Sequence, residues 1–256
     1  MIGAIIGDIV GSVYERHSVK TTDFPLFGHR SRFTDDTVLT VATADSILHG
    51  THYGQNYREY YRRFPHAGYG GRFIEWASSS SMRPYNSYGN GSAMRVSPVA
   101  YAIDTLEEVL LQARMSAEVT HNHPEGIKGA QAVAAVAFLA RKGEGKEHIR
   151  EYVTQSFGYD LTEPIASIRT WYRFDVSCRG SVPQAITAFL ESHDFEDAIR
   201  LAVSIGGDSD TIACIAGGIA QAFYGEVPSA MEEKALFLLD PVLREVVDVF
   251  RKSYKC

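Results

Sequence analysis

Two short clusters of oxygen-bearing side chains stand out in this sequence. One reads Thr34-Asp35-Asp36-Thr37, the other reads Asp208-Ser209-Asp210-Thr211, and a run rich in small apolar residues follows each. Carboxylate and hydroxyl oxygens are the ligands that hard divalent cations such as Mg²⁺ and Mn²⁺ prefer. Four aspartates in one pocket would repel one another unless cations neutralised them. The pattern therefore predicts two halves of one metal site. The ligand candidates are Thr34, Asp35, Asp36, Asp208, Asp210 and Thr211.

A simpler interpretation is that both clusters cap helices. Asp and Thr are good N-cap residues because a side-chain oxygen accepts from the free N–H groups of the first turn. Negative charge at that end also suits the helix dipole. Capping needs only one such residue, however, and each cluster supplies two aspartates and a threonine. The surplus carboxylates, present twice, favour metal binding.

Composition limits the class of protein. A chain of 256 residues with 45% hydrophobic content can bury a large core, and no low-complexity stretch divides it, so we expect one domain over residues 1–256. The net charge of −6 argues against a nucleic-acid-binding surface as the main function, although a local basic patch is compatible with it.

The cysteines and the N-terminus indicate a cellular location. Cys178, Cys214 and Cys256 are widely spaced and match no zinc spacing, so we expect reduced thiols in a cytoplasmic protein. Asp8 interrupts the first apolar run too early for a signal peptide. No apolar run reaches the ~18 residues that a membrane span needs, so we expect no membrane association.

Helical periodicity dominates the rest of the chain. Apolar residues recur at helical spacing over 106–119, 127–139, 195–205 and 232–250, and Pro241 is expected to divide the last of these. No alternation of apolar and polar residues is long enough for a sheet. The fold class is therefore predicted to be all-α, with about nine or more helices.

Glycine spacing indicates where helices approach closely. Gly3, Gly7 and Gly11 fall on one face if this segment is helical. A face without side chains lets another backbone come near. We therefore expect tight packing of helices around a central site.

A long glycine-, serine- and tyrosine-rich segment, 66–90, is expected to be irregular and functional. It leads into Tyr88-Gly89-Asn90-Gly91-Ser92, where backbone N–H groups could face an anion, although Asn-Gly is also an ordinary turn. Downstream, His121 and His123 could bind zinc, cap a helix or donate to a phosphate.

Together these pieces resemble the ADP-ribosylglycohydrolases, a family that includes the dinitrogenase-reductase-activating glycohydrolase and the ADP-ribosylserine hydrolases. Five motifs in order carry the resemblance: GDIVGSVYE at 7–15, FTDDT at 33–37, YGNGSAMR at 88–95, TH at 120–121 and GGDSDT at 206–211. The resemblance implies a compact, orthogonal multi-helix fold with two Mg²⁺ or Mn²⁺ ions at its centre. Segments 69–85 and 157–180 match no motif of the family, which leaves substrate choice open.

The resemblance also implies roles for single residues. The six ligand candidates would hold the metals from two helix starts, and Glu15 would be a mobile carboxylate that meets the metals or the ribose. Residues Gly89, Asn90, Gly91 and Ser92 would cradle a diphosphate. Tyr88 would stack on the adenine side, and His121 would contact a phosphate or the distal ribose. Glu15, Asp36 and Asp210 are the candidates for proton transfer, with the choice among them open.

The function implied is a metal-dependent hydrolase that releases ADP-ribose from a modified protein or a small conjugate. The bond cleaved could be to serine oxygen, arginine nitrogen, a nucleic-acid base or an acetyl ester. The alternatives are a catalytically silent binding or structural member of the same fold, and an unrelated all-α protein whose clusters only cap helices. Glu15 and all four aspartates are present, which favours the enzyme.

Overall fold

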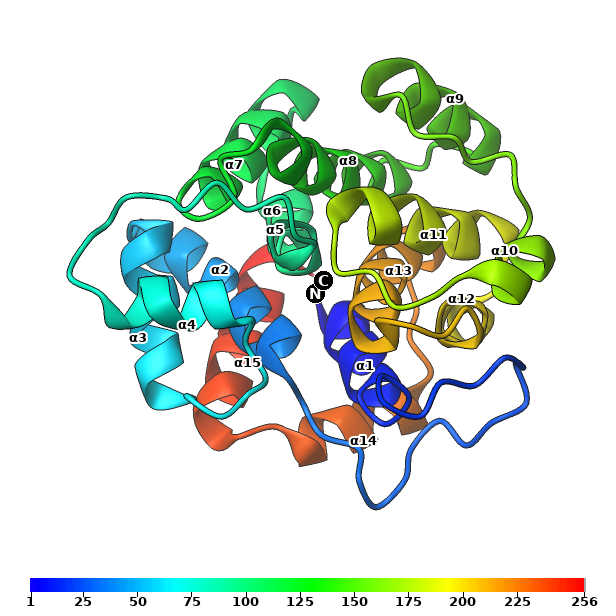
Figure 1. Cartoon of the computed structure of the whole chain (residues 1–256), viewed down its shortest axis with the longest axis horizontal. Coiled ribbons are helices and arrows are strands. Elements are labelled where there is room, and N and C mark those ends of the chain that lie inside the picture. The colour runs from blue at the N-terminus through cyan, green and yellow to red at the C-terminus, as the bar shows by residue number, and fades with distance from the viewer. Residues whose placement is uncertain (256) are drawn as a thin grey trace.

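The computed structural model describes residues 1–255, and helices make up its regular structure. Within that range the only β-type pairing is an isolated bridge between Gly89 and Ser177, so the all-α prediction is confirmed (Figure 1). The helices are α1 (Ile2–Gly11), α2 (Asp35–His49), α3 (Tyr53–Arg63), α4 (Gly71–Ser78), α5 (Gly91–Met94), α6 (Ser97–Ala102), α7 (Leu106–Glu118), α8 (Pro124–Arg141), α9 (Lys146–Phe157), α10 (Ile165–Trp171), α11 (Cys178–Glu191), α12 (Phe195–Ser204), α13 (Ser209–Tyr224), α14 (Ser229–Leu238) and α15 (Pro241–Tyr254).

Helices α1 and α13 form the centre of the molecule and touch backbone to backbone. A methyl group added to Gly7 would overlap the carbonyl oxygen of Ala213, and one added to Gly3 would overlap that of Gly217. The third glycine, Gly11, lies equally close to the start of α13. The expected glycine face is therefore confirmed, and its partner is the apolar helix that follows the second acidic cluster.

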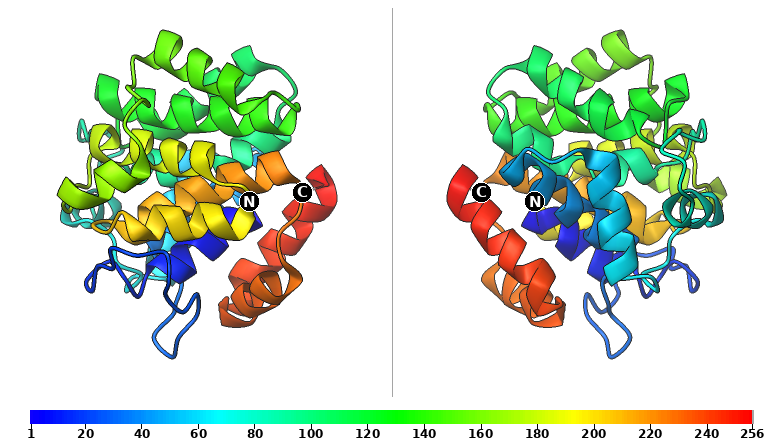
Figure 2. Two further views of the ribbon diagram at one scale, coloured as in Figure 1. Left: turned by 90° about the vertical axis from the view of Figure 1, so that its right-hand side faces the viewer. Right: turned by 90° about the vertical axis from the view of Figure 1, so that its left-hand side faces the viewer.

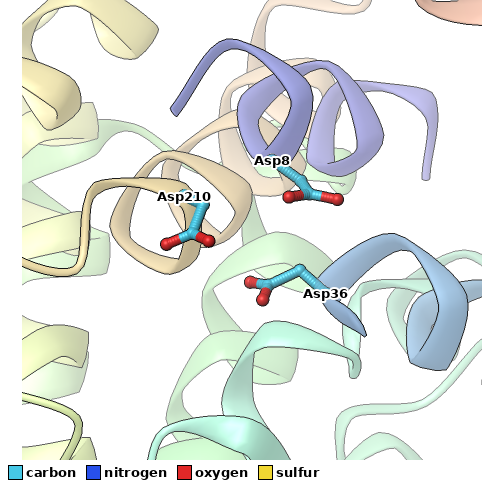
Figure 3. A group of neighbouring side chains, drawn as sticks. All are labelled: Asp8, Asp36 and Asp210. Atoms are coloured by element: carbon cyan, nitrogen blue, oxygen red, sulfur yellow. The ribbon is translucent and has the colours of Figure 1, made fainter. Parts of the chain in front are cut away.

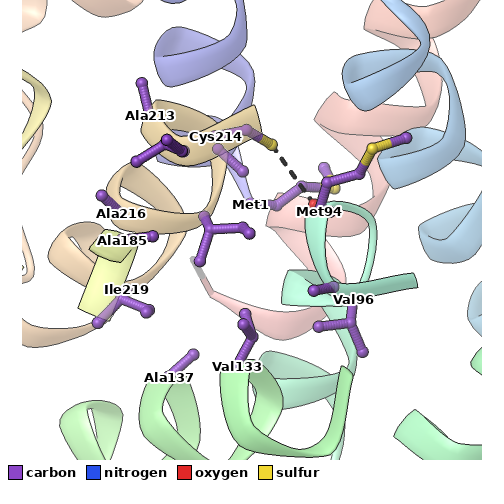
Figure 4. Packing of buried hydrophobic residues seen from close by; sticks show 14 of the residues in the cluster. Met1, Met94, Val96, Val133, Ala137, Ala185, Ala213, Cys214, Ala216 and Ile219 are labelled. Carbon is purple, nitrogen blue, oxygen red and sulfur yellow. Dashed lines mark hydrogen bonds between the residues drawn. The ribbon is translucent and has the colours of Figure 1, made fainter. Parts of the chain in front are cut away.

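The other helices surround this pair. The alanine-rich helix α8 packs on α7, α11 and α13, whereas α2 lies between α3 and α15. Figure 2 shows α1 enclosed near the middle and α14 and α15 at one flank. Figure 4 shows small side chains of α8, α11 and α13 meeting in the core, where the thiol of Cys214 donates to the carbonyl oxygen of Met94 over 3.4 Å.

Several predicted helices are found where the sequence placed them. Helices α7, α8 and α12 coincide with the three interior patterns, and Pro241 begins α15 after a break that follows α14. The expectation of an irregular segment over 66–90 is wrong for one stretch, because α4 lies inside it and buries Phe73 and Trp76. Glycines and serines on both sides of α4 obscured its amphipathic pattern.

None of the helices in residues 1–255 has the length and apolar character that crossing a membrane would require.

We expect Gly7→Ala to destabilise the protein strongly, because the added methyl group would force α1 and α13 apart. Overpacking a core costs about 1–3 kcal/mol, and a clash with backbone lies at or beyond the upper end of that range. Chemical denaturation measures the difference. The matched control is Gly145→Ala at the start of α9, where an added methyl group meets nothing within 4 Å. Equal stability of the two variants would contradict the close contact.

Candidate functional site

A cavity of about 440 Å³ opens where α2 and α13 begin. Both acidic clusters line it, although they are far apart in sequence. The structure therefore brings all six predicted ligand candidates to one cavity, together with Glu15. These lining residues are Thr34, Asp35, Asp36, Asp208, Asp210, Thr211 and Glu15.

The carboxylates form two compact groups that could each hold a cation. In one group, oxygens of Asp8, Asp36 and Asp210 lie within 4.8 Å of one another, and in the other the same holds for Glu15, Asp208 and Asp210. Asp210 belongs to both groups. Figure 3 shows the carboxylates of the first group pointing toward one another from three different helices. The Oδ1 atom of Asp36 is buried and has no hydrogen-bond partner. Buried polar atoms normally have a partner, and a bound cation could be the partner of this oxygen.

Asp8 is the residue of this site to which the sequence analysis gave no role. Its carboxylate accepts hydrogen bonds from the backbone N–H and hydroxyl of Thr34, at 2.9 and 2.7 Å, and from those of Thr37, at 3.1 and 2.5 Å. A side chain of α1 therefore satisfies free donors at the first turn of α2. The sequence did contain one signal for such a role: Asp8 is a single charge inside an otherwise apolar helix. A charged residue in that position is rarely buried unless it has a partner.

The capping interpretation applies to part of the first cluster. The Thr34 side chain accepts from the backbone N–H of Asp36 at 3.2 Å and is the N-cap of α2. The first N–H groups of α2 donate to the carbonyl oxygen of Ala67, to Thr34 and to Asp8. The carboxylates of Asp35 and Asp36 are therefore not needed as caps. Capping and the carboxylate grouping therefore coexist, and Asp8 takes part in both.

The second cluster is held by a glycine turn and by an asparagine. Gly206 and Gly207 have φ of 74° and 72°, a left-handed conformation that favours glycine, and they lead directly into Asp208. The side-chain amide of Asn90 donates to Asp208 over 2.6 Å. Asn90 therefore fixes one carboxylate of the site from the opposite wall.

Burial and mutual repulsion make these acids hard to ionise. Burial raises the pKa of Asp35 to about 8, with a further rise from the neighbouring charge of Asp8. Burial raises the pKa of Asp208 to about 6, although the Asn90 hydrogen bond opposes the shift. The pKa values of Asp36 and Asp210 are raised well above the ordinary range, first by burial and then by nearby aspartates. Among the described residues, no lysine or arginine forms a salt bridge with these acids.

The glycine-rich loop forms the next wall of the cavity. Gly89, Asn90 and Gly91 line it, and the loop is fixed where the backbone N–H of Asn90 donates to the carbonyl oxygen of Val176 over 2.8 Å. Ser92 lies outside the lining: its hydroxyl is directed to the carbonyl oxygen of Gly126, to which it donates over 2.7 Å.

Tyr88, the residue expected to stack on the adenine side, lies at the surface. It is 55% exposed, lies outside the cavity lining and meets the ring of His123 edge-on at 5.6 Å. The ring therefore stands on the surface beside the glycine loop.

The two histidines have different surroundings. His121 is buried and lines the cavity behind Gly91. His123 is the N-cap of α8, where its Nδ1 accepts from the backbone N–H of Glu125 at 3.1 Å. Neither group of candidate metal ligands in residues 1–255 contains a histidine, which disfavours the zinc interpretation.

Aromatic residues at the rim were not predicted from sequence. Phe73 and Tyr85 line one side of the cavity, and Phe174 and Val176 line another. Phe174 is 56% exposed, so a bound molecule could cover it. These residues come from the two segments that match no family motif.

Comparison with known proteins agrees with this arrangement. A family model described as ADP-ribosylglycohydrolase matches residues 1–254. ADP-ribosylhydrolase ARH3 of Homo sapiens is 26% identical over 340 residues, covering 99% of this chain and 93% of that protein. ADP-ribosylarginine hydrolase Tri1 of Pseudomonas putida is 25% identical, and the match covers 88% of this chain and 69% of that protein. A solved structure of an ADP-ribosylglycohydrolase-related protein complex superposes with a TM-score of 0.74 at 25% identity, covering 99% of this chain and 96% of that one. The chain belongs to the ADP-ribosylglycohydrolase family.

Proposed function

We propose that this protein hydrolyses the bond between ADP-ribose and an acceptor, using two Mg²⁺ or Mn²⁺ ions. The observation that carries the proposal is the pair of three-carboxylate groups that share Asp210 at one cavity. The family of the chain and the names of its relatives supply the substrate class. The protein would act on an ADP-ribosylated protein or a small ADP-ribose conjugate.

The cavity offers different chemistry at its two ends. The acidic end would hold the cations, with Asp8, Asp36 and Asp210 at one position and Glu15, Asp208 and Asp210 at the other. Cations there would orient the ribose diol and lower the pKa of a bound water. Thr34, Asp35 and Thr211 lie within reach of the same end and would complete the ligand set.

The glycine end would hold the rest of the nucleotide. Gly89 and Gly91 carry no side chain, so a diphosphate could approach the loop closely there. The backbone N–H groups of Gly89 and Asn90 already donate to Ser87 and Val176. Tyr88 is exposed beside this loop, so its ring is available to stack on an adenine that extends out of the cavity. A volume of about 440 Å³ lies within the range of pockets that bind molecules of this size.

Glu15 is our candidate for proton transfer. It is half-buried at the cavity wall, whereas Asp36 and Asp210 are buried among other carboxylates. Glu15 would offer one carboxylate oxygen to the second cation position, and because the residue is half-buried its other oxygen could exchange a proton with solvent after each turnover. Glu15 would accept the proton of the attacking water or protonate the leaving atom.

A panel of defined ADP-ribosyl conjugates tests the activity and the linkage together. Serine-linked, arginine-linked and acetyl-ester conjugates are incubated with the protein, with Mg²⁺, Mn²⁺ or a chelator, and released ADP-ribose is measured by mass spectrometry. We expect release from at least one conjugate in the presence of metal. A protein that binds ADP-ribose and releases none from any conjugate would instead be the silent, binding member of the family.

We expect Asp210→Asn to abolish turnover and to raise the melting temperature of the metal-free protein. Asp210 is shared by both carboxylate groups, so its loss removes a ligand from each and also relieves repulsion with its neighbours. Thermal unfolding with and without Mg²⁺ checks this: wild type should be stabilised by the ion and the variant should not.

The matched control for Asp210→Asn is Asp23→Asn, which removes one exposed carboxylate from the loop before α2. It should retain the stabilisation by Mg²⁺. Stabilisation of the Asp210 variant equal to that of wild type would contradict the shared-ligand arrangement.

We expect Glu15→Gln to lower turnover by about 10²–10⁴-fold, the usual range for a general acid or base. Affinity for free ADP-ribose, measured by calorimetry, should stay near the wild-type value because the glycine loop is untouched. Turnover at the wild-type rate on a conjugate that the enzyme cleaves would remove Glu15 from the mechanism.

A further inference from the structure

A buried arginine in the lining of the cavity has no acidic partner. Arg95 is fully buried, and no salt bridge among residues 1–255 includes it. Its guanidinium lies 4.1 Å from the ring centre of Tyr57, and its Nε and Nη1 atoms have no hydrogen-bond partner. Buried charges are costly unless something compensates them. The position of this charge therefore calls for a role.

The remaining guanidinium nitrogen fixes a hydroxyl. Nη2 of Arg95 donates to the carbonyl oxygen of Ser116 over 2.9 Å and to the hydroxyl oxygen of Thr120 over 2.8 Å. A guanidinium has only donors, so the Thr120 oxygen must accept. The hydroxyl has one hydrogen left to give.

The Thr120 hydroxyl donates its hydrogen bond to His121. The Nδ1 atom of His121 lies 2.7 Å from the Thr120 hydroxyl, whereas the competing acceptor, the carbonyl oxygen of Ala117, is 3.5 Å away. The shorter contact is the better hydrogen bond. Nδ1 therefore accepts, and in the neutral ring the hydrogen resides on Nε2.

Nε2 faces the glycine loop. A methyl group added to Gly91 would lie 3.2 Å from this atom, and one added to Gly89 would lie 3.6 Å from it. Within the described part of the chain, Nε2 makes no hydrogen bond of its own. It is thus a donor without an acceptor, at the wall where the proposed function places a diphosphate.

The charges around His121 keep the ring neutral. Burial lowers the pKa of His121 well below its ordinary value, and the positive charges of Arg95 and Arg72 lower it further. The other titratable ring beside it is Tyr85, whose centre lies 5.9 Å away. The ring therefore donates from Nε2 and accepts at Nδ1.

We propose that Arg95 is a positioning residue: acting through Thr120, it holds His121 as the tautomer that donates from Nε2 to a diphosphate oxygen. This inference rests on the proposed function for the identity of the ligand. Linked hydrogen bonds polarise one another, so the guanidinium also strengthens the Nε2 donor. An anionic ligand would in turn compensate the buried charge of Arg95.

The tautomer can be read directly, without ligand, by nitrogen-15 NMR of protein labelled at histidine. The His121 signals are assigned by their loss in His121→Gln. We expect wild type and Thr120→Ser, which keeps the hydroxyl, to carry the hydrogen on Nε2, and Thr120→Val to give a mixture of tautomers. A wild-type ring with its hydrogen on Nδ1 would overturn the proposal.

Arg95 is tested by the same measurement. Arg95→Lys retains a donor for Thr120 and should preserve the wild-type tautomer, whereas Arg95→Met should give the mixture seen with Thr120→Val. An unchanged tautomer in folded Arg95→Met protein would show that Arg95 does not position His121. If Arg95→Met fails to fold, Thr120→Ser and Thr120→Val still test the hydrogen bond between Thr120 and His121.

Calorimetry with ADP-ribose supplies the second readout. We expect Thr120→Val to weaken binding by about tenfold, as for loss of one well-placed hydrogen bond, and Thr120→Ser to bind within about twofold of wild type. Thr187→Val, the same change at a buried position outside the cavity lining, is the control and should bind normally. If wild type binds ADP-ribose and Thr120→Val binds it equally well, the hydrogen-bond chain from Arg95 through Thr120 to His121 has no role in binding, and the proposed function is unaffected. If wild type bound no ADP-ribose, the proposed function would fail, and donation to a diphosphate with it, although the tautomer measurement would stand.

Discussion

The site depends on the backbone contact between α1 and α13. Because glycines remove the side chains from one face of α1, the two helices approach more closely than side chains would allow. The same contact brings Asp8 of α1 to Asp210 of α13, and α2 adds Asp36 through its hydrogen bonds to Asp8. A separation of α1 and α13 by the width of one methyl group would pull the first carboxylate group apart.

This architecture places an electrostatic cost, that of burying several carboxylates together, at the centre of the fold. Buried aspartates repel one another, and burial makes each of them harder to ionise. The surrounding apolar core, in which small side chains of α8, α11 and α13 interdigitate, must outweigh that cost. Under the proposed function, bound cations would convert the repulsion into attraction, and folding would then be thermodynamically linked to loading of the site.

Much of the fold and part of the site followed from the sequence, for identifiable reasons. Helical periodicity located α7, α8 and α12, and paired aspartates at two helix starts pointed to one cavity. Asp8 received no role because its partners lie in α2, and sequence spacing does not show which helix a buried charge faces. Tyr88 and Ser92 share a motif with the glycine loop, yet local backbone direction turns one outward and buries the other.

The rim was unpredictable for a different reason. Phe73 and Phe174 come from separate segments, and only the packing of α4 and of the connection between α10 and α11 brings both to the cavity. No periodicity relates them. Under the proposed function the acceptor would meet this rim, so the choice of linkage would depend on the part of the chain that local patterns describe least.

The hydrogen bonds that Asp8 accepts from the start of α2 have a consequence for ion selectivity. The position of Asp36 relative to Asp210 is set by the hydrogen bonds from the start of α2 to the Asp8 side chain and by the backbone contact of α1 with α13. Such a frame cannot readily widen. Ca²⁺ needs longer bonds and more ligands than Mg²⁺, about 2.3–2.6 Å and six to eight oxygens. We therefore expect the stiffness of three helices, more than the number of negative charges, to discriminate against the larger ion.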